Sequence, residues 1–358
     1  MKPRVIAFYL PQFHPIPEND AWWGKGFTEW TNVGKAKPLF PGHYQPKVPA
    51  DLGYYDLRLP ETREAQAEMA REAGIEGFCY WHYWFGNGKR LLERPFNEVL
   101  ESGKPDFPFC LAWANESWHE KFWNDWGSSS KNLLIEQQYG GVEDYKEHFY
   151  ILLPAFKDVR YMKIEDKPIF MIYRPFEFEE VSLFIELWRK LAKENGLKGI
   201  YFIGHTQNFE KHGTSFLNRG FDAINTVRHY DVRRHRCFLA RVFHKLLRII
   251  FHIPYCYKYQ SAKKYFITES EHQENIFPTI IPNWDHTPRS GNKGYVITDS
   301  TPQKFGEAVS EAVDAVKEKS QDKRIIFIKS WNEWGEGNYI EPDLKYGKGY
   351  LEELKNNL

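Results

Sequence analysis

The chain contains eight short and nearly continuous apolar runs, which follow one another along almost its whole length. Each run is too short for a helix, and continuous apolar residues are typical of parallel strands that are buried on both faces of a sheet. We therefore predict eight parallel strands, over Val5 to Leu10, Gly77 to Tyr80, Phe109 to Trp113, Pro168 to Tyr173, Gly199 to Gly204, Ala223 to Val227, Pro278 to Pro282 and Arg324 to Ile328.

Helix-compatible stretches separate most of these runs, with apolar residues three and four positions apart. Eight such alternations predict an α/β fold, a (β/α)8 TIM barrel that forms a single domain over residues 1–358. The alternative is an open doubly wound sheet, but no Gly-x-Gly-x-x-Gly motif opens the first helix. The unit near Asn218 has the weakest helical pattern. The predicted helices span Leu59 to Ala73, Leu91 to Ser102, Val142 to Val159, Glu179 to Asn195 and Pro302 to Lys319.

The composition bears on the classes of partner. Lysine plus arginine and aspartate plus glutamate both number 48, so we expect no nucleic-acid partner. The four cysteines (Cys79, Cys110, Cys237 and Cys256) are far apart and show no ligand spacing, so we expect no disulfide framework, no metal and no other cofactor. The chain enters strand-like sequence at Val5 without a charged and apolar leader, which predicts a cytoplasmic protein.

Aromatic residues make up 17% of the chain, and the tryptophans gather where predicted strands give way to loops. Tryptophan and tyrosine rings have an apolar face and a polar tip, so they stack on the C–H face of a sugar while neighbours bind its hydroxyls. An aromatic-rich core is the alternative interpretation. The tryptophans in question are Trp22, Trp23, Trp30, Trp81, Trp84, Trp113, Trp118, Trp123, Trp126, Trp284, Trp331 and Trp334.

Polar and aromatic side chains follow seven of the eight predicted strands. The active site of a TIM barrel forms at the carboxyl ends of its strands, so we expect these side chains to converge on one pocket. The histidines among them follow different strands without ligand spacing, which favours sugar-hydroxyl binding over metal binding. The candidate substrate-binding residues are Tyr9, His14, Trp30, Trp81, His82, Trp113, Asn115, Glu116, Tyr173, His205, Trp284, Asp285, Arg289, Trp331 and Asn332.

Two carboxylates, Glu333 and Glu336, lie three residues apart just after the eighth predicted strand. The glycines of this segment allow a turn that directs both acids into one cavity, which the neighbouring indoles are expected to wall. Such a pair suits glycosidic-bond chemistry, so we predict that both are catalytic; a nucleophile-and-acid pair about 5 Å apart and a wider inverting pair both fit. Glu29 and Glu116 are alternative acids, and a solvated acidic loop is the alternative to a catalytic pair.

Five segments of the chain resemble sequences of the WbsX-like family. They are residues 7–15 (AFYLPQFHP), 22–33 (WWGKGFTEWTNV), 77–85 (GFCYWHYWF), 112–116 (AWANE) and 331–337 (WNEWGEG). Members of this family occur in bacterial polysaccharide gene clusters and are commonly labelled glycosyltransferases. The resemblance covers nearly the whole chain and implies a carbohydrate-active enzyme of lipopolysaccharide or capsule metabolism.

The implied fold and the paired glutamates are similar to those of the endo-α-1,2-mannosidase family of glycoside hydrolases. That resemblance implies a retaining enzyme without a metal. It implies that Glu333 deprotonates the substrate's own 2-hydroxyl, which attacks the anomeric carbon to form a 1,2-anhydro sugar. Glu336 would then be the group that protonates the leaving oxygen and later activates water. The residues by themselves support only two carboxylates, one of them kept protonated by burial or by its neighbours.

The segment 228–266 interrupts the barrel pattern between the predicted sixth and seventh strands. From Arg228 to Lys264 it holds ten lysines and arginines but one acid, Asp231. The stretch 239–254 combines a basic stripe with apolar positions, the pattern of an amphipathic helix that lies on an anionic membrane. We therefore expect a basic helical insertion with peripheral contact at the inner membrane face and a lipid-linked substrate. The alternative is a helix packed on the barrel with its basic face in water.

Three functions fit these features. The leading hypothesis is an enzyme that acts on glycosidic bonds of a bacterial oligo- or polysaccharide, by hydrolysis or transglycosylation through a retaining reaction. The second is a nucleotide-sugar-dependent glycosyltransferase of O-antigen or capsule biosynthesis, although the chain has neither a DxD motif nor a glycine-rich phosphate loop. The third is a non-catalytic glycan-binding barrel.

Overall fold

The computed structural model describes residues 2–119 and 132–358, and its centre is a closed barrel of eight parallel strands. Each strand pairs in parallel with its neighbours, and β1 closes the ring because it pairs with both β2 and β15. The predicted (β/α)8 TIM barrel is confirmed. The strands are β1 (Arg4–Tyr9), β2 (Gly77–Trp84), β4 (Phe109–Trp113), β8 (Lys167–Ile172), β9 (Tyr201–Thr206), β10 (Ala223–Thr226), β12 (Ile276–Ile280) and β15 (Ile325–Ile328).

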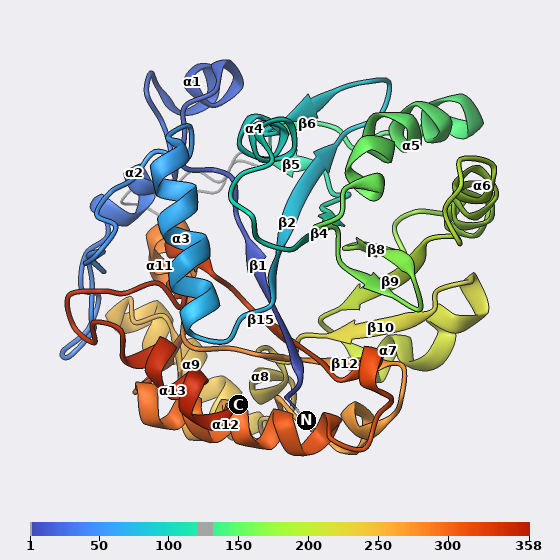
Figure 1. Cartoon of the computed structure of the whole chain (residues 1–358). Coiled ribbons are helices and arrows are strands. Elements are labelled where there is room, and N and C mark those ends of the chain that lie inside the picture. The colour runs from blue at the N-terminus through green and yellow to red at the C-terminus, as the bar shows by residue number, and fades with distance from the viewer. Residues whose placement is uncertain (1, 120–131) are drawn as a thin grey trace.

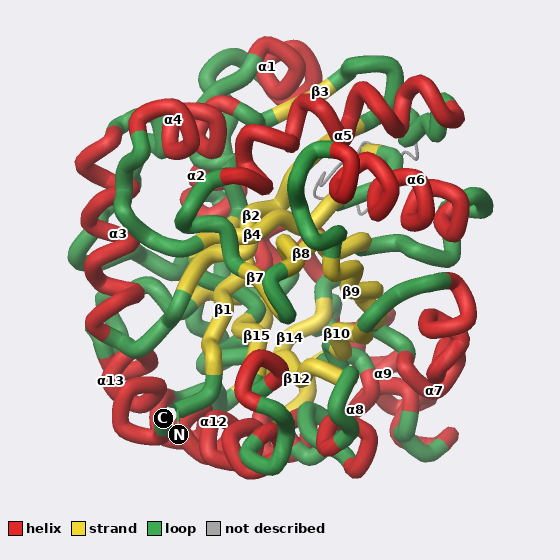
Figure 2. Tube along the Cα trace, turned by 45° about the vertical axis from the view of Figure 1, so that its right-hand side comes forward, coloured by secondary structure: helices red, strands yellow, loops and turns green. Residues whose placement is uncertain are grey.

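Helices surround the strand ring, as Figures 1 and 2 show. Each of the five predicted helices overlaps an observed one. Where the helical pattern is weakest, before β10, the chain forms only the short helix α7 (Phe209–His212) and the 3₁₀ helix η1 (Gly213–Arg219). The longer helices are α3 (Pro60–Glu72), α4 (Arg94–Ser102), α5 (Gly141–Lys157), α6 (Val181–Glu194), α12 (Pro302–Val316) and α13 (Gly349–Asn357).

Local sequence determines where these helices begin and end. Helix α12 has Pro302 in its first turn, and the Thr301 hydroxyl accepts a hydrogen bond from the Lys304 amide at 3.4 Å. Helix α4 ends at Gly103, whose φ of 71° is a left-handed conformation that favours glycine. The strands between the helices are buried on both faces, which accounts for their continuous apolar sequence.

No helix within the described residues is long and apolar enough to cross a membrane.

Additional short elements lie in the loops between and after the barrel strands. The elements are α1 (Pro17–Trp23) and α2 (Glu29–Gly34) after β1, β3 (Arg90–Leu91) after β2, β5 (Trp118–His119) and β6 (Leu133–Ile135) after β4, β7 (Lys163–Ile164) before β8, α11 (Thr287–Ser290), η3 (Gly291–Lys293), β13 (Trp284–Asp285) and β14 (Tyr295–Thr298) after β12, η4 (Gln321–Lys323) before β15, and β16 (Asn332–Glu333), η5 (Trp334–Glu336) and β17 (Asn338–Tyr339) after β15.

The segment between β10 and β12 is helical over much of its length. It forms α8 (Asp231–Arg234), α9 (Phe238–Phe251), β11 (Tyr255–Lys258), α10 (Tyr259–Lys263) and the 3₁₀ helix η2 (Glu269–His272). Strand β11 joins β14 and β13 in a separate three-stranded sheet. The basic helical insertion between the sixth and seventh barrel strands is thus present, and its sheet connects it to the loop after β12.

Candidate active site

A cavity of about 520 Å³ lies at the carboxyl ends of the barrel strands. Its lining includes at least one residue from the segment that follows, or ends, each of the eight barrel strands. The volume is within the usual range for small-molecule sites, about 300–1,000 Å³. Much of the wall is aromatic, contributed by Trp23, Phe27, Trp81, Tyr83, Trp118, Tyr173, Tyr230 and Trp284.

Seven of the predicted site residues line this cavity. Both predicted catalytic acids are among them, together with two indoles, a tyrosine, an arginine and a further glutamate. Side chains from five strand exits therefore meet in one space, as expected for the carboxyl face of a barrel. The seven residues are Trp81, Glu116, Tyr173, Trp284, Arg289, Glu333 and Glu336.

A tight hairpin places the two glutamates. Strands β16 and β17 pair antiparallel, and the turn between them carries Glu336. Gly335 has no room for a side chain, since a Cβ there would collide with the Glu29 carboxylate. Gly337 has a φ of 52°, and a Cβ there would lie 2.7 Å from that of Asp285. Only glycine fits at these two positions, because the hairpin packs closely against Glu29 and Asp285. This close packing places Glu333 and Glu336 at the cavity wall.

Arg289 is the cation on which the acids converge. Its Nη1 lies 2.7 Å from Glu336 Oε1 and 3.5 Å from Glu333 Oε1, and its Nε donates to Glu29 Oε2 at 3.1 Å. Asp285, another predicted site residue, forms no ion pair with Arg289 in the described part of the chain. Asp285 instead accepts hydrogen bonds from His43, Gln45 and Thr287, which fixes the start of the α11 turn that carries Arg289.

Lys329, at the end of β15, is the second cation of the cluster. Its Nζ lies 3.3 Å from Glu333 Oε2 and 3.7 Å from Glu336 Oε2. The Ser330 hydroxyl donates to Glu333 Oε2 at 3.0 Å, and His286 Nε2 lies 3.5 Å from Glu336 Oε1. Each glutamate therefore contacts both cations in a mostly buried site, where charge interactions are much stronger than in water.

The carboxyl groups of Glu333 and Glu336 differ in how readily they bind a proton. Burial raises the pKa of Glu333, and the neighbouring Glu336 carboxylate adds to the effect. Burial alone would also raise the pKa of Glu336, but the Arg289 and Lys329 cations outweigh it and hold this pKa well below its usual range. Three carboxylates, with Glu29, face two cations, so one proton makes the cluster neutral, and within the pair a proton binds to Glu333 in preference to Glu336.

The alternation of side chains along β2 explains why some predicted residues lie outside the cavity. Trp81 and Tyr83 line it, whereas His82 and Trp84 point to the other side of the strand. There His82 Nε2 lies 2.9 Å from His148 Nε2, and the Trp84 ring stacks on His148 at a centroid distance of 4.6 Å. The sequence prediction gave His82 the same role as Trp81, although adjacent strand residues face opposite ways.

Two predicted asparagines bind backbone instead of facing the cavity. Asn332 accepts from the Leu10 amide at 2.8 Å and donates to the Leu10 carbonyl at 3.0 Å, which ties the glutamate hairpin to β1. Asn115 makes the same pair of bonds with Arg174, at 2.7 and 3.0 Å. Arg174 in turn binds Glu116 at 3.1 Å on the cavity wall. Both amides thus hold neighbouring loops in place.

Other predicted residues lie behind the wall. His205 is buried beneath Trp81 and Tyr173, and burial lowers its pKa to about 3, so it is neutral. His14 bonds to the Pro11 carbonyl, and the Trp30 indole donates to the Tyr55 carbonyl. His205 Nδ1 lies 2.8 Å from Asn225 Oδ1, so each of the three side chains has one polar partner within the protein. The Nε2 atoms of His14 and His205 are buried and have no hydrogen-bond partner among the described residues.

The tryptophans divide between core and cavity. Trp331 and Trp334 flank the two predicted catalytic acids in sequence but are 0% and 1% exposed, so they support the hairpin and do not wall the cavity. Trp113 is buried too, and its indole donates to the Trp84 carbonyl at 2.8 Å. The walls come from the indoles of Trp23, Trp81, Trp118 and Trp284. Two further predicted aromatic positions, Trp123 and Trp126, lie outside the described residues.

Sequence reasoning missed Lys329 and Tyr230 and left Tyr83 out of the candidates. Lys329 had a usable signal, because an amine directly after a buried apolar strand requires a charged partner. Tyr230 follows the sixth strand and lies at the start of the basic insertion, which directed attention to its arginines. Among the described residues, no group of three or more His, Cys, Asp or Glu is placed to hold a metal ion.

A buried network under the hairpin involves the predicted residue Tyr9. The Tyr9 hydroxyl donates to Gln66 Oε1 at 2.6 Å, and Gln66 Nε2 donates to Glu341 Oε1 at 2.7 Å. The Glu341 carboxylate also accepts from the Trp334 indole at 2.6 Å and from Tyr55 at 2.9 Å. Burial outweighs these donors and raises the pKa of Glu341 to about 7.

The substitution Glu341→Gln is expected to stabilise the fold in mildly alkaline buffer. A pKa raised in the folded state means that the contribution of Glu341 is present below its unfolded value of about 4.3 and is lost as pH rises through about 7. Rotation of the Gln66 amide would keep the network bonded in the variant. Thermal unfolding should show a gain of up to about 3 kcal/mol at pH 8 that disappears near pH 4. A gain or loss independent of pH would contradict this assignment.

Comparison with known sequences gives one family across the chain. The family model described as Glycosyltransferase WbsX matches residues 5–354. Two relatives from Xanthomonas campestris pv. campestris, strains B100 and ATCC 33913, are each described as Uncharacterized protein WxcX and are 34% identical over 367 residues. The match covers 99% of this chain and 49% of each relative. The chain therefore spans about half the length of the curated relatives it matches.

Comparison with solved structures gives the same barrel. The GH99 endo-α-mannosidase from Bacteroides thetaiotaomicron superposes with a TM-score of 0.61 at 15% identity, covering 99% of this chain and 96% of that chain. A structure described as a glycoside hydrolase-like protein also gives 0.61, at 14% identity, with 99% and 93% coverage. At these identities the likeness shows a shared fold.

Proposed function

The chain belongs to the WbsX glycosyltransferase family, and on this premise we propose that it acts on glycosidic bonds of a bacterial oligo- or polysaccharide, with Glu333 and Glu336 as its catalytic pair. Its family and its fold are those of carbohydrate-active enzymes. The observation that carries the proposal is the convergence of both carboxylates on one aromatic-lined cavity, where two cations contact each of them. A sugar would stack on the rings while its hydroxyls bind the polar groups.

The spacing of the pair supports a retaining reaction. Glu333 Oε1 and Glu336 Oε1 lie 3.5 Å and 2.7 Å from the same nitrogen of Arg289. The two oxygens cannot be farther apart than these distances together, which is below the separation of about 6.5–9.5 Å found in inverting pairs. A separation below that range favours a two-step reaction, by hydrolysis or transglycosylation, over direct displacement by water.

The roles that we propose are those implied by family resemblance, with Glu333 as base toward the sugar 2-hydroxyl and Glu336 as acid toward the leaving oxygen. The pKa directions instead favour the proton on the other member, Glu333. A hydroxyl that donates to Glu333 favours its anion, and the proton then moves to Glu336 within the pair. Substrate binding thus sets the protonation that the reaction needs.

A product assay tests this function. The chain is incubated with α-linked oligosaccharides and bacterial polysaccharides, with and without nucleotide sugars, and the products are identified with their anomeric configuration. Cleavage or transfer without a nucleotide sugar, with retention, is the expected result. Transfer that requires a nucleotide sugar would replace the proposal with the second candidate, which the family description favours. Binding without any product would instead indicate a glycan-binding barrel.

The substrate class and the location of the enzyme form a further part of the proposal. A lipid-linked glycan and contact with the inner membrane face both depend on helix α9, which lies in the insertion between β10 and β12. Its exposed surface can be tested without any assay of turnover.

A further inference from the structure

Helix α9 presents its apolar side chains to solvent. Of the sixteen large hydrophobic side chains that are exposed in the described part of the chain, eight belong to this helix of 14 residues. None of its residues is buried. Contiguous apolar surfaces of this kind mark interaction sites in soluble proteins. The eight side chains are Phe238, Leu239, Val242, Phe243, Leu246, Ile249, Ile250 and Phe251, between 39% and 77% exposed.

Two members of the basic stripe of α9, His244 and Arg248, face the protein. His244 stacks on Tyr257 of β11 at a centroid distance of 5.3 Å, and the Arg248 guanidinium lies 5.0 Å from the Tyr255 ring. Both side chains are only partly exposed. The alternative from the sequence, a helix packed on the barrel with its basic face in water, does not account for the eight exposed apolar side chains. The orientation is the reverse of that of an ordinary surface helix.

Cations without acidic partners lie in and beside this apolar face. The acid of the segment, Asp231, is buried and paired with Arg228 and Arg234. Five other cations form no ion pair with a carboxylate in the described part of the chain. Three of them lie against tyrosine rings, and Lys245 and Arg241 are exposed. The five are Arg233, Arg236, Arg241, Lys245 and Arg248.

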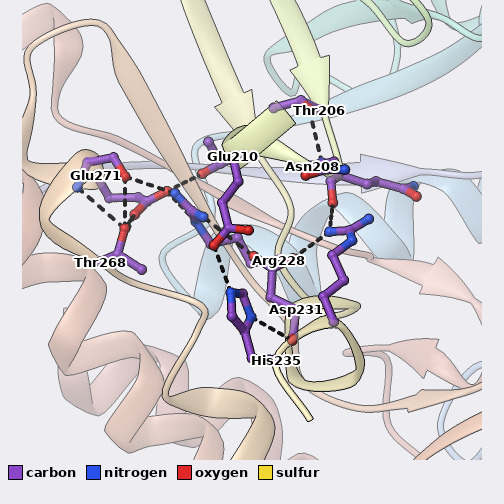
Figure 3. Close-up of polar contacts among 12 residues, drawn as sticks. Thr206, Asn208, Glu210, Arg228, Asp231, His235, Thr268 and Glu271 are labelled. Atoms are coloured by element: carbon purple, nitrogen blue, oxygen red, sulfur yellow. Dashed lines mark hydrogen bonds and ion pairs between the residues drawn. The ribbon is translucent and has the colours of Figure 1, made fainter. Parts of the chain in front are cut away.

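A buried polar network anchors both ends of the insertion. Arg228, just after β10, donates to Glu271 Oε1 at 2.8 Å, and Thr268 donates to the same carboxylate (Figure 3). His235 lies 2.7 Å from Glu210, and its other ring nitrogen lies 2.9 Å from the Asp231 carbonyl. Residues 226–235 and 268–271 are thereby joined, so α9 projects from a fixed base.

The helix is close in the fold to the cavity. Tyr230 lines the cavity and comes directly before α8, which lies beside α9 in both Figures 1 and 2. On the other side, β11 supports α9 and pairs with β14, which pairs with β13. Trp284 of β13 lines the cavity. Two strand spacings, together about 10 Å, separate β11 from β13.

From these observations we propose that α9 lies in the interface of an anionic lipid bilayer, with its apolar face inserted and its cations at the headgroups, and brings the cavity to a glycan carried by a lipid. The helix is about 21 Å long, too short to span a bilayer but suited to lying in its plane. The proposed bilayer contact depends only on the observations about α9, whereas the proposal that the substrate is a glycan rests on the proposed function.

A second copy of the chain is a poor occupant of this surface. A symmetric dimer would place Arg241 and Lys245 of one copy near the same residues of the other, with no carboxylate to compensate. Protein interfaces are also depleted in lysine at their cores. Anionic headgroups beside an apolar interior match both the cations and the exposed phenylalanines, so charge complementarity favours the bilayer.

Vesicle sedimentation tests the proposal. The chain should bind vesicles of phosphatidylcholine with phosphatidylglycerol, bind vesicles of phosphatidylcholine alone far less, and lose binding as salt is added. The double substitution Leu246→Ser/Ile250→Ser should weaken binding at least about tenfold, since it removes inserted apolar area. Arg241→Glu/Lys245→Glu should weaken it at least about 25-fold on anionic vesicles, at about fivefold per cation. Leu183→Ser/Leu344→Ser, which also removes exposed leucines, is the matched control and should bind as the parent does.

Several outcomes would overturn the proposal. The first is absence of binding to anionic vesicles. The second is an equal loss of vesicle binding in the Leu183→Ser/Leu344→Ser control. The third is a dimer, or a complex with an acidic protein, that forms with the parent chain but not with the Leu246→Ser/Ile250→Ser variant. All substituted side chains are exposed, so unfolding curves should match the parent. Failure here is separable from failure of the proposed function, because the Glu336→Gln variant should still bind vesicles and the α9 variants should still act on water-soluble oligosaccharides.

Discussion

The substitutions Glu333→Gln and Glu336→Gln are each expected to lower turnover of a natural glycan by about 10²–10⁴-fold, the usual contribution of one positioned acid or base. Glutamine keeps the size of the side chain but removes both the charge and the proton. The aromatic residues of the cavity wall are unchanged in both variants, so substrate affinity should change much less than turnover. Steady-state kinetics together with calorimetric binding of the same oligosaccharide separates the two quantities.

Leaving groups distinguish the roles within the pair. A sugar fluoride needs little protonation when its bond breaks, so Glu336→Gln should regain most of its activity on such a substrate. Glu333→Gln should not, because the 2-hydroxyl still requires a base. The reverse pattern would place the acid at Glu333, the member of the pair whose pKa is raised. Glu307→Gln, on the outer helix α12 and paired with Lys263, is the control and should behave as the parent. Unchanged turnover in both pair variants would end the catalytic assignment.

The barrel was predictable because its signal is repeated eight times. Each buried strand is a short apolar run, and an error in one run, such as the weak helical unit near Asn218, does not change the count. The position of the cavity follows from the fold class, since parallel strands in a barrel end on one face. The pair Glu333 and Glu336 was found for the same reason, as both acids come directly after a strand.

Side-chain direction was less predictable than position. Trp81 and His82 are neighbours within β2, yet the first lines the cavity and the second contacts His148. Strand alternation would have separated them, had the strand been known to continue to Trp84. Asn115 and Asn332 carry sugar-binding amides in principle, but both pair with backbone groups from distant parts of the sequence. A sequence does not show such partners.

The electrostatics of the site also depend on distant partners. The sequence places Lys329 four residues before Glu333, but Arg289 and Glu29 come from two other loops. Their convergence makes the cluster neutral with one proton, a property that no local motif contains. It also makes Arg289 the residue whose loss should affect the fold most strongly, because three carboxylates depend on it.

The substitution Arg289→Met is expected to destabilise the protein by about 3–5 kcal/mol near neutral pH, since it leaves buried carboxylates without their main cation. In the parent, the lowered pKa of Glu336 contributes stability above its unfolded value, and this contribution is lost as pH falls. Without Arg289 that contribution disappears, and burial instead favours the protonated acid. The difference in the free energy of unfolding between variant and parent should therefore be largest above about pH 7 and decrease toward about pH 4. Urea unfolding at several pH values measures it.

Two companion variants make this result specific to charge. Arg289→Lys keeps a cation but lacks the planar fork that reaches Glu29 and Glu336 together, so its loss of stability should be intermediate. Glu29→Gln/Arg289→Met removes one of the three carboxylates and should recover part of the stability that Arg289→Met loses, because fewer like charges remain. Two results would mean that Arg289 acts through packing, with the charges of the cluster compensated by other groups. One is a stability difference between variant and parent that stays constant with pH, and the other is a double variant no more stable than Arg289→Met.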